Sequence, residues 1–107
     1  MNFTEYQELA RRTQNHELNR HSMLDHALWG LSAEVGEVSS LFQKTHQGHV
    51  LSRDALSKEI GDVLWMLSEL CDVYELDLGE IAAENIEKLR RRYPEGFDAE
   101  HSLHREE

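Results

Sequence analysis

Residues that break helices or crosslink chains are scarce in this sequence of 107 residues. It has one proline, Pro94, and six glycines, so little in it would interrupt a long helix. Its one cysteine, Cys71, excludes an internal disulfide. Because Cys71 lies in an apolar run, we expect it to have a packing role in a reducing cytosol.

Long apolar runs are absent as well. No uninterrupted stretch approaches the roughly 20 residues that a membrane-spanning helix needs. The first residues, 2–12, are polar and amphipathic and do not resemble a signal peptide. We therefore expect a soluble, cytoplasmic protein without a membrane partner.

Basic residues are outnumbered almost two to one. Eleven Lys and Arg stand against 21 Asp and Glu, and the formal charge is −10. A field of that sign repels nucleic acid polymers, so we expect no such partner. A phosphate substrate would need divalent cations to mediate its approach.

The chain length predicts one domain, residues 1–107, with a small core. Apolar residues recur with helical period and no useful strand alternation is present, so the predicted fold class is all-α. We predict a four-helix bundle whose small core is completed by homo-oligomerisation. The expected helices span about residues 4–19, 23–45, 53–74 and 78–92, followed by a polar tail, 93–107.

Capping residues mark several of these boundaries. Thr4, Ser52 and Asp77 each precede a helical pattern and are predicted N-caps. In the tail, Phe97 and Leu103 are the side chains expected to hold the chain against the surface.

A short acidic motif occurs twice without a gap. Glu34-Val35-Gly36-Glu37-Val38 is repeated as Glu59-Ile60-Gly61-Asp62-Val63. Acids three residues apart share one helix face. The same faces carry mostly apolar residues, namely Ala27, Leu31, Val38, Leu41 and Thr45 in one helix and Ala55, Leu56, Val63, Met66 and Leu70 in the other. Four carboxylates thus point toward a core, where they need a partner to be stable.

The two glycines inside the repeat, Gly36 and Gly61, lie on the side away from the acids. A helix glycine costs about 1 kcal/mol relative to alanine. Because a glycine occurs at the same place in both copies, we expect close helix packing on that side and not merely a glycine that the helix tolerates.

The last predicted helix carries polar residues in the same frame as the acids. Asn85 and Lys88 are three residues apart, and Arg92 follows one turn later. If the helices pack stripe to stripe, these groups meet the carboxylates at one end of a bundle.

Such a set of oxygen ligands beside cations suits Mg²⁺, a hard ion that bridges carboxylates to phosphates. The alternative is that the four acids are solvated groups near the edge of the stripe. Two gapless copies on apolar faces favour the metal.

The ordered motifs resemble the MazG-like branch of the all-α nucleoside triphosphate pyrophosphohydrolases. An ExxE pair precedes an ExxD pair, and 21 residues, Val38 to Lys58, separate them. The similarity continues through 85–89 and 92–97, and it covers roughly residues 24–98.

This resemblance implies hydrolysis of a nucleoside triphosphate to the monophosphate and pyrophosphate, with water attacking the α-phosphorus. It also implies a homodimer or a dimer-of-dimers tetramer. One of the glutamates would orient the water, and which one stays open. The implied Mg²⁺ ligands, with Mn²⁺ as a possible substitute, are Glu34, Glu37, Glu59 and Asp62. The implied substrate contacts are Asn85, Lys88 and Arg92.

Two alternatives remain open at this stage. One is a dUTP- or phosphoribosyl-ATP-directed enzyme of the same superfamily, because nothing in the sequence specifies base or sugar. The other is a non-catalytic helical module whose acids bind a structural metal.

Histidines and tryptophans are secondary candidates. His16, His21 and His26 recur every five residues, a spacing that does not stack on one helix face, so a histidine metal site is disfavoured. His26 lies two turns before Glu34 and could line the pocket. For Trp29 and Trp65, packing or an oligomer interface is favoured over stacking on a base.

Overall fold

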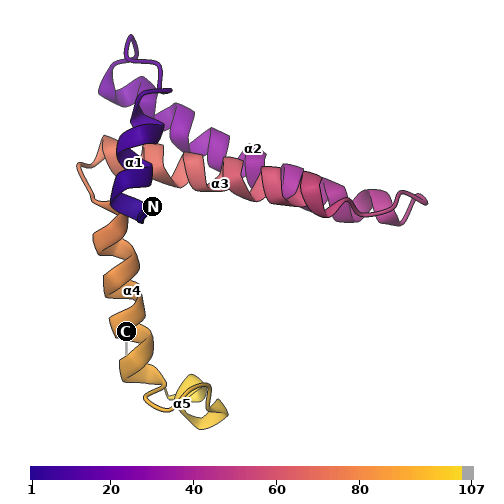
Figure 1. Ribbon diagram of the computed structural model, residues 1–107, viewed down its shortest axis with the longest axis vertical. Helices are drawn as coiled ribbons and strands as arrows, with labels where there is room; N and C mark the ends of the chain where they lie inside the picture. Colours follow the sequence, from indigo (N-terminus) through magenta and orange to yellow (C-terminus); the bar gives the residue numbers. More distant parts are fainter. Residues whose placement is uncertain (105–107) are drawn as a thin grey trace.

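A computed structural model of the protein describes residues 1–104, which fold into helices joined by short loops (Figure 1). This confirms the all-α prediction. The helices are α1 (Phe3–Arg11), α2 (Arg20–Thr45), α3 (Arg53–Val73), α4 (Leu78–Arg92) and α5 (Ala99–Leu103).

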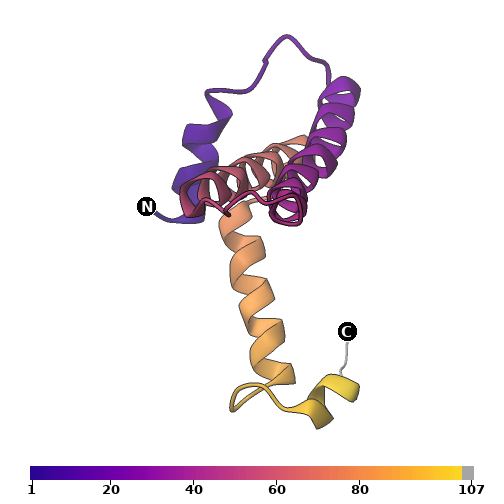
Figure 2. The same cartoon turned by 90° about the vertical axis from the view of Figure 1, so that its right-hand side faces the viewer.

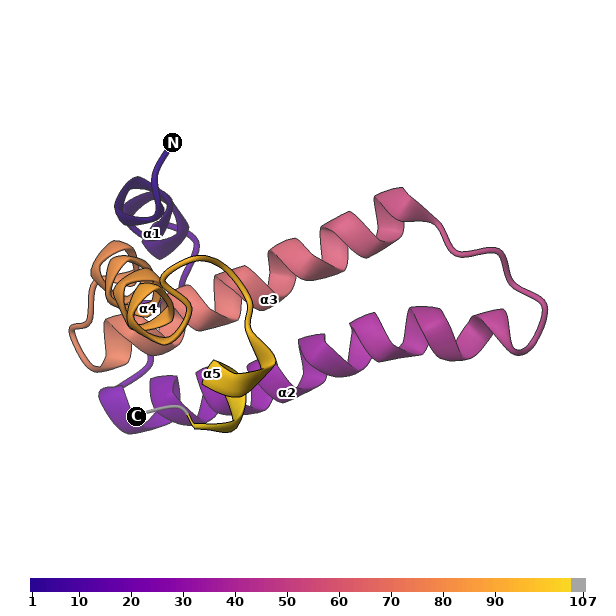
Figure 3. The same cartoon turned by 90° about the horizontal axis from the view of Figure 1, so that it is seen from below.

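Helices α2 and α3 form a long antiparallel hairpin, and Figure 3 shows the two helices side by side. The predicted apolar stripes face each other there, and all their members except Thr45 are at least half-buried. Ala27 is fully buried. A Cβ at Gly30 would lie 2.5 Å from Sδ of Met66, so the two helices approach closely at Gly30.

Gly36 and Gly61 do not take part in such packing. A Cβ at either position would meet nothing within 4 Å, and both residues are exposed. The expected close approach at these glycines is therefore wrong within this chain. It occurs instead at Gly30 and at Gly79, where a Cβ would lie 2.4 Å from Oγ1 of Thr4.

Helix α1 ends at Arg11 and not near Asn19 as predicted. The residues between α1 and α2 form turns, and Gln14 among them is buried with Nε2 donating to Oδ2 of Asp72 at 2.6 Å. Asn19 accepts a hydrogen bond from N–H of Ser22, so it caps α2, which begins at Arg20 and not at 23.

The predicted N-cap of α1 is also wrong. Asn2 caps the helix in a capping box with Glu5. Thr4 is used elsewhere, because its hydroxyl donates to Oδ1 of Asp77 at 2.9 Å. Ser52 and Asp77 cap α3 and α4 as predicted.

The turn between α3 and α4 is a Schellman motif. Glu75 takes the left-handed conformation, with φ of 54°. N–H of Leu76 donates to O of Cys71, and N–H of Glu75 donates to O of Asp72. The side chain of Gln7 lies in the same corner: its Nε2 donates to Asp72 and to O of Leu76, and its Oε1 accepts from N–H of Leu78.

Helix α4 leaves this corner and projects away from the hairpin (Figures 1 and 2). Its main packing partner is α1. The four helices therefore do not close into a bundle within one chain. Consequently Ile81 and Ile86 remain 38% and 47% exposed.

The end of the chain contains a helix that the sequence did not predict. Asp98 accepts hydrogen bonds from N–H of Glu100 and of His101 and so caps α5. Phe97 and Leu103 stay exposed, so the expectation that they pin the tail is wrong, although the Phe97 ring contacts Tyr93. The last residues of the predicted tail, 105–107, lie outside the described part.

The apolar core of the described chain is small. Its buried members are Ala10, Ala27, Cys71, Val73 and Leu78. Cys71 has the packing role expected of it, and burial raises the pKa of its thiol. Among the described helices, none is apolar enough over a sufficient length to cross a membrane.

Candidate metal centre

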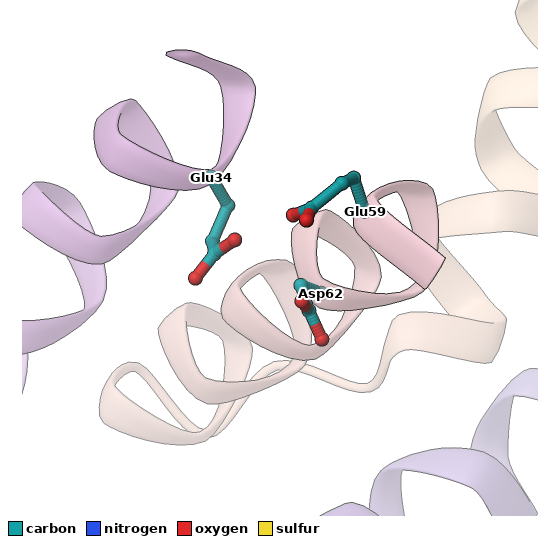
Figure 4. A group of neighbouring side chains, drawn as sticks. All are labelled: Glu34, Glu59 and Asp62. Atoms are coloured by element: carbon teal, nitrogen blue, oxygen red, sulfur yellow. The ribbon is translucent and has the colours of Figure 1, made fainter. Parts of the chain in front are cut away.

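Three of the four predicted ligands come together across the hairpin. Glu34 lies on α2 opposite Glu59 and Asp62 of α3, and the three side chains are close together in Figure 4. One carboxylate oxygen from each lies within 4.8 Å of the others. Glu34 and Glu59 are half-buried and Asp62 is exposed, so the cluster is accessible.

The cluster has an excess of negative charge. The pKa of Glu34 is raised, first by desolvation, then by repulsion from Asp62, Glu59 and Glu37, and by a hydrogen bond with Glu59. The pKa of Tyr6 is also raised, mainly by burial and then by the charge of Asp62. Helix α1 thus places a phenol within the field of the cluster.

These residues fit a hard divalent cation. Ligands about 2.1 Å from Mg²⁺ lie at most about 4.2 Å apart, on opposite sides of the ion. Oxygens already within 4.8 Å of one another need only a small side-chain movement to reach that spacing. A cation would also relieve the repulsion that raises the pKa of Glu34.

The fourth predicted ligand, Glu37, is exposed and does not join this group of three. It follows Glu34 by about one turn of α2, and its charge contributes to the raised pKa of Glu34. Glu37 is therefore adjacent to the cluster.

The predicted substrate contacts lie on α4, away from the acids of the same chain. Asn85 is exposed, while Lys88 and Arg92 are half-buried. Because α4 projects away from the hairpin at the α3–α4 corner and packs mainly on α1, the helix that carries these residues does not run alongside the carboxylates of the same protomer.

Sequence reasoning missed a buried carboxylate on α3. Only 1% of the Glu69 side chain is exposed, and its Oε1 lies 2.5 Å from Nδ1 of His26 on α2. Glu69 follows Asp62 by seven residues, a spacing that returns to the same helix face. This spacing was the available signal in the sequence. It places Glu69 on the helix face of Asp62, but it does not identify His26 as the partner of Glu69.

Trp65 stands beside this pair. Its ring meets the His26 ring edge to face, with centroids 6.3 Å apart. Its Nε1–H donates to Oγ1 of Thr13 at 2.7 Å. Trp65 is half-buried, whereas Trp29 is 72% exposed.

A second acidic position, Asp72, has a structural role. It accepts hydrogen bonds from Gln7, Arg11 and Gln14, with Nη2 of Arg11 at 2.8 Å. All three donors come from α1 or the turn after it, so Asp72 holds this segment against α3. Its oxygens are already engaged and are not free to bind a metal.

Comparison with known proteins identifies the class. The profile of the MazG nucleotide pyrophosphohydrolase domain matches residues 24–97, most of the chain. The chain belongs to this family. It is also similar to the Gene 37 protein of Mycobacterium phage L5, with 30% identity over 78 residues that cover 68% of each chain. No solved structure gives a significant match.

Proposed function

We propose that the protein is an Mg²⁺-dependent hydrolase of a nucleoside or deoxynucleoside triphosphate that releases the monophosphate and pyrophosphate. Its role would be sanitation or control of the nucleotide pool. The observation that carries the proposal is the group of three convergent carboxylates in which the pKa of Glu34 is raised. Membership of the family supports the reaction type.

Glu34, Glu59 and Asp62 would hold the metal. When bound, Mg²⁺ would polarise phosphoryl oxygens and make a coordinated water more acidic. Mn²⁺, which also accepts oxygen ligands, would substitute for it. Glu37, exposed one turn from Glu34, would complete the ligand set or orient the attacking water.

The remaining groups would come from a second copy of the chain. Asn85, Lys88 and Arg92 lie on a helix that projects away from the acids of its own protomer. In a homodimer or a dimer-of-dimers tetramer, the projecting helix of one copy would bring these cations and this amide toward the carboxylates of another. There they would hold phosphate oxygens as charge develops.

The proposal is tested with a panel of nucleoside triphosphates and Mg²⁺, scored for monophosphate and pyrophosphate. The wild-type protein should turn over at least one of them. Glu59→Gln should lower kcat by about a hundredfold with the helical circular dichroism unchanged, because it would remove a metal ligand, and even groups behind such ligands cost about 10- to 100-fold when changed. Glu17→Gln, in the exposed turn before α2, is the matched control and should have wild-type activity.

Release of inorganic phosphate without pyrophosphate would contradict the proposal. So would the absence of turnover across the whole panel, dUTP and phosphoribosyl-ATP included. In that case metal-induced thermal stabilisation without turnover would favour a non-catalytic metal-binding module.

A further inference from the structure

A buried carboxylate, Glu69, contacts a histidine, His26, across the α2–α3 hairpin. The Glu69 side chain is 1% exposed, and its carboxylate contacts Nδ1 of His26 at 2.5 Å. A carboxylate at that depth needs a partner to be stable. The partner it has is a histidine that is itself 47% exposed and therefore only half enclosed.

This contact determines how the imidazole is presented. With Nδ1 held by Glu69, the other ring nitrogen, Nε2, remains for a further hydrogen bond. Within the described residues, Nε2 has no hydrogen-bond partner. The T-shaped contact with Trp65, whose indole is anchored on Thr13, fixes the ring from the side. The His26 ring is thus held in one orientation, with Nε2 left to bind a ligand.

The pair lies on the same seam of the hairpin as the acidic cluster. Glu34 faces Glu59, and one turn further along, Gly30 faces Met66. His26 and Glu69 are the next facing pair.

The separation suits a nucleotide. Asp62 and Glu69 are seven residues apart on one face of α3, which is about 10 Å along the helix axis. This is comparable with the distance from the phosphates of a nucleotide to its base. Trp65 lies between the two positions in sequence and offers an aromatic surface near the histidine.

We propose that His26 is the residue that recognises the nucleobase of the substrate. It would use Nε2 to hydrogen-bond the polar edge of the base, beside the ring of Trp65. Glu69 would be a positioning residue that acts through His26. This inference rests on the proposed pyrophosphohydrolase function and deepens it, because it locates the part of the site that distinguishes one triphosphate from another.

The first test is a steady-state comparison of bases. In His26→Ala, the ratio of kcat/KM between the best and the poorest nucleotide should fall about tenfold, the worth of one hydrogen bond to a polar base. The change should lie mainly in KM. Glu69→Gln should give a smaller fall of the same kind, because an amide oxygen can still accept from Nδ1–H.

Two further variants make this test specific. The side chain of His21, on the same helix, is 84% exposed. His21→Ala should therefore leave the ratio of kcat/KM between the two nucleotides unchanged. His26→Gln keeps an amide N–H for Glu69 and replaces His26→Ala if that variant does not fold. Equal loss of kcat/KM for every base, or no loss, would overturn the proposal while leaving the hydrolase function intact.

The second test does not need catalysis. In EDTA, the wild-type His26 ring resonances should shift with a nucleoside monophosphate and not with ribose 5-phosphate. If no triphosphate is hydrolysed, the proposed function fails and this binding experiment alone decides the inference. Identical spectra with the two ligands would then refute it.

Discussion

Glu34 connects the stability of the protein to the ion it would bind. Its pKa is raised by desolvation and by the neighbouring acids, so ionising it in the folded state costs free energy. A group with a raised carboxyl pKa destabilises the fold as pH rises through that pKa, and the stability returns as pH falls. A bound cation would remove the penalty by favouring the ionised form.

Glu34→Gln should therefore change how stability responds to pH and to Mg²⁺. Without metal, the variant should melt at a higher temperature than the wild type at pH 7, and the difference should shrink toward pH 4. With millimolar Mg²⁺ the wild type should gain thermal stability and the variant should not. Thermal melts at several pH values, with and without Mg²⁺, measure both effects. A variant that gains as much from Mg²⁺ as the wild type would exclude Glu34 as a ligand.

The sequence predicted the acids of the cluster, but it did not predict the contact between His26 and Glu69 on the same hairpin. Glu34, Glu59 and Asp62 were predictable because a doubled motif places them on apolar helix faces, where a carboxylate needs a partner to be stable. His26 and Glu69 are 43 residues apart in sequence and lie on different helices. Their contact therefore depends on the register in which α2 packs against α3. Nothing local in the sequence specifies that register.

At the scale of elements, the corner between α3 and α4 is held in a conformation that its sequence does not favour. Glu75 occupies the left-handed position of the Schellman motif, where glycine is usual. A side chain in that region costs about 1–2 kcal/mol. The hydrogen bonds around the turn and the side chain of Gln7 compensate for it.

Glu75→Gly should stabilise the protein by up to about 1 kcal/mol, because relief of this strain exceeds the extra chain entropy that glycine loses. Urea denaturation is the measurement. Glu95→Gly in the exposed segment after α4 has no such conformation to relieve and should be neutral or slightly destabilising. Equal effects of the two substitutions would refute the role of the strained turn.

Helix boundaries show the limit of periodicity as a guide. The starts of α3 and α4 were predictable, because Ser52 and Asp77 accept the backbone N–H of the third helical residue, as strong N-caps do. The pattern after Arg11 was misread as helix because Gln14 and Asn19 have tertiary and capping roles that end α1 early. The Thr4 hydroxyl was likewise diverted to Asp77, where its hydrogen bond is the largest cause of a lowered Asp77 pKa.

At the scale of the whole molecule, one chain is extended for its length. Its radius of gyration is 17.1 Å, against roughly 13 Å for a compact domain of this length. Apolar side chains remain exposed on α2 and α4, among them Trp29, Phe42 and Ile86. This is the architecture expected if neighbouring copies supply the missing packing.

We expect the protein to associate in solution with a mass of at least twice the 12.5 kDa of one chain. Ile86→Glu, on the projecting helix, should shift the protein toward the monomer and lower activity together with association. Light scattering coupled to size exclusion measures the mass. Glu84→Gln on the same helix is the control and should leave it unchanged. A wild-type protein that is monomeric at micromolar concentration yet active would contradict this assembly.

The α3–α4 corner has a mechanical consequence for such an assembly. Helix α4 has 15 residues and is about 22 Å long, so a rotation of 10° at the corner displaces its far end by about 4 Å. Gln7, buried at the pivot, fixes that angle through its hydrogen bonds to Asp72, Leu76 and Leu78. A small change in the angle at the first turn of α4 therefore produces a large displacement of its last turn. In the proposed assembly, a side chain far from the carboxylates would in this way align the proposed phosphate contacts of one copy with the acids of another.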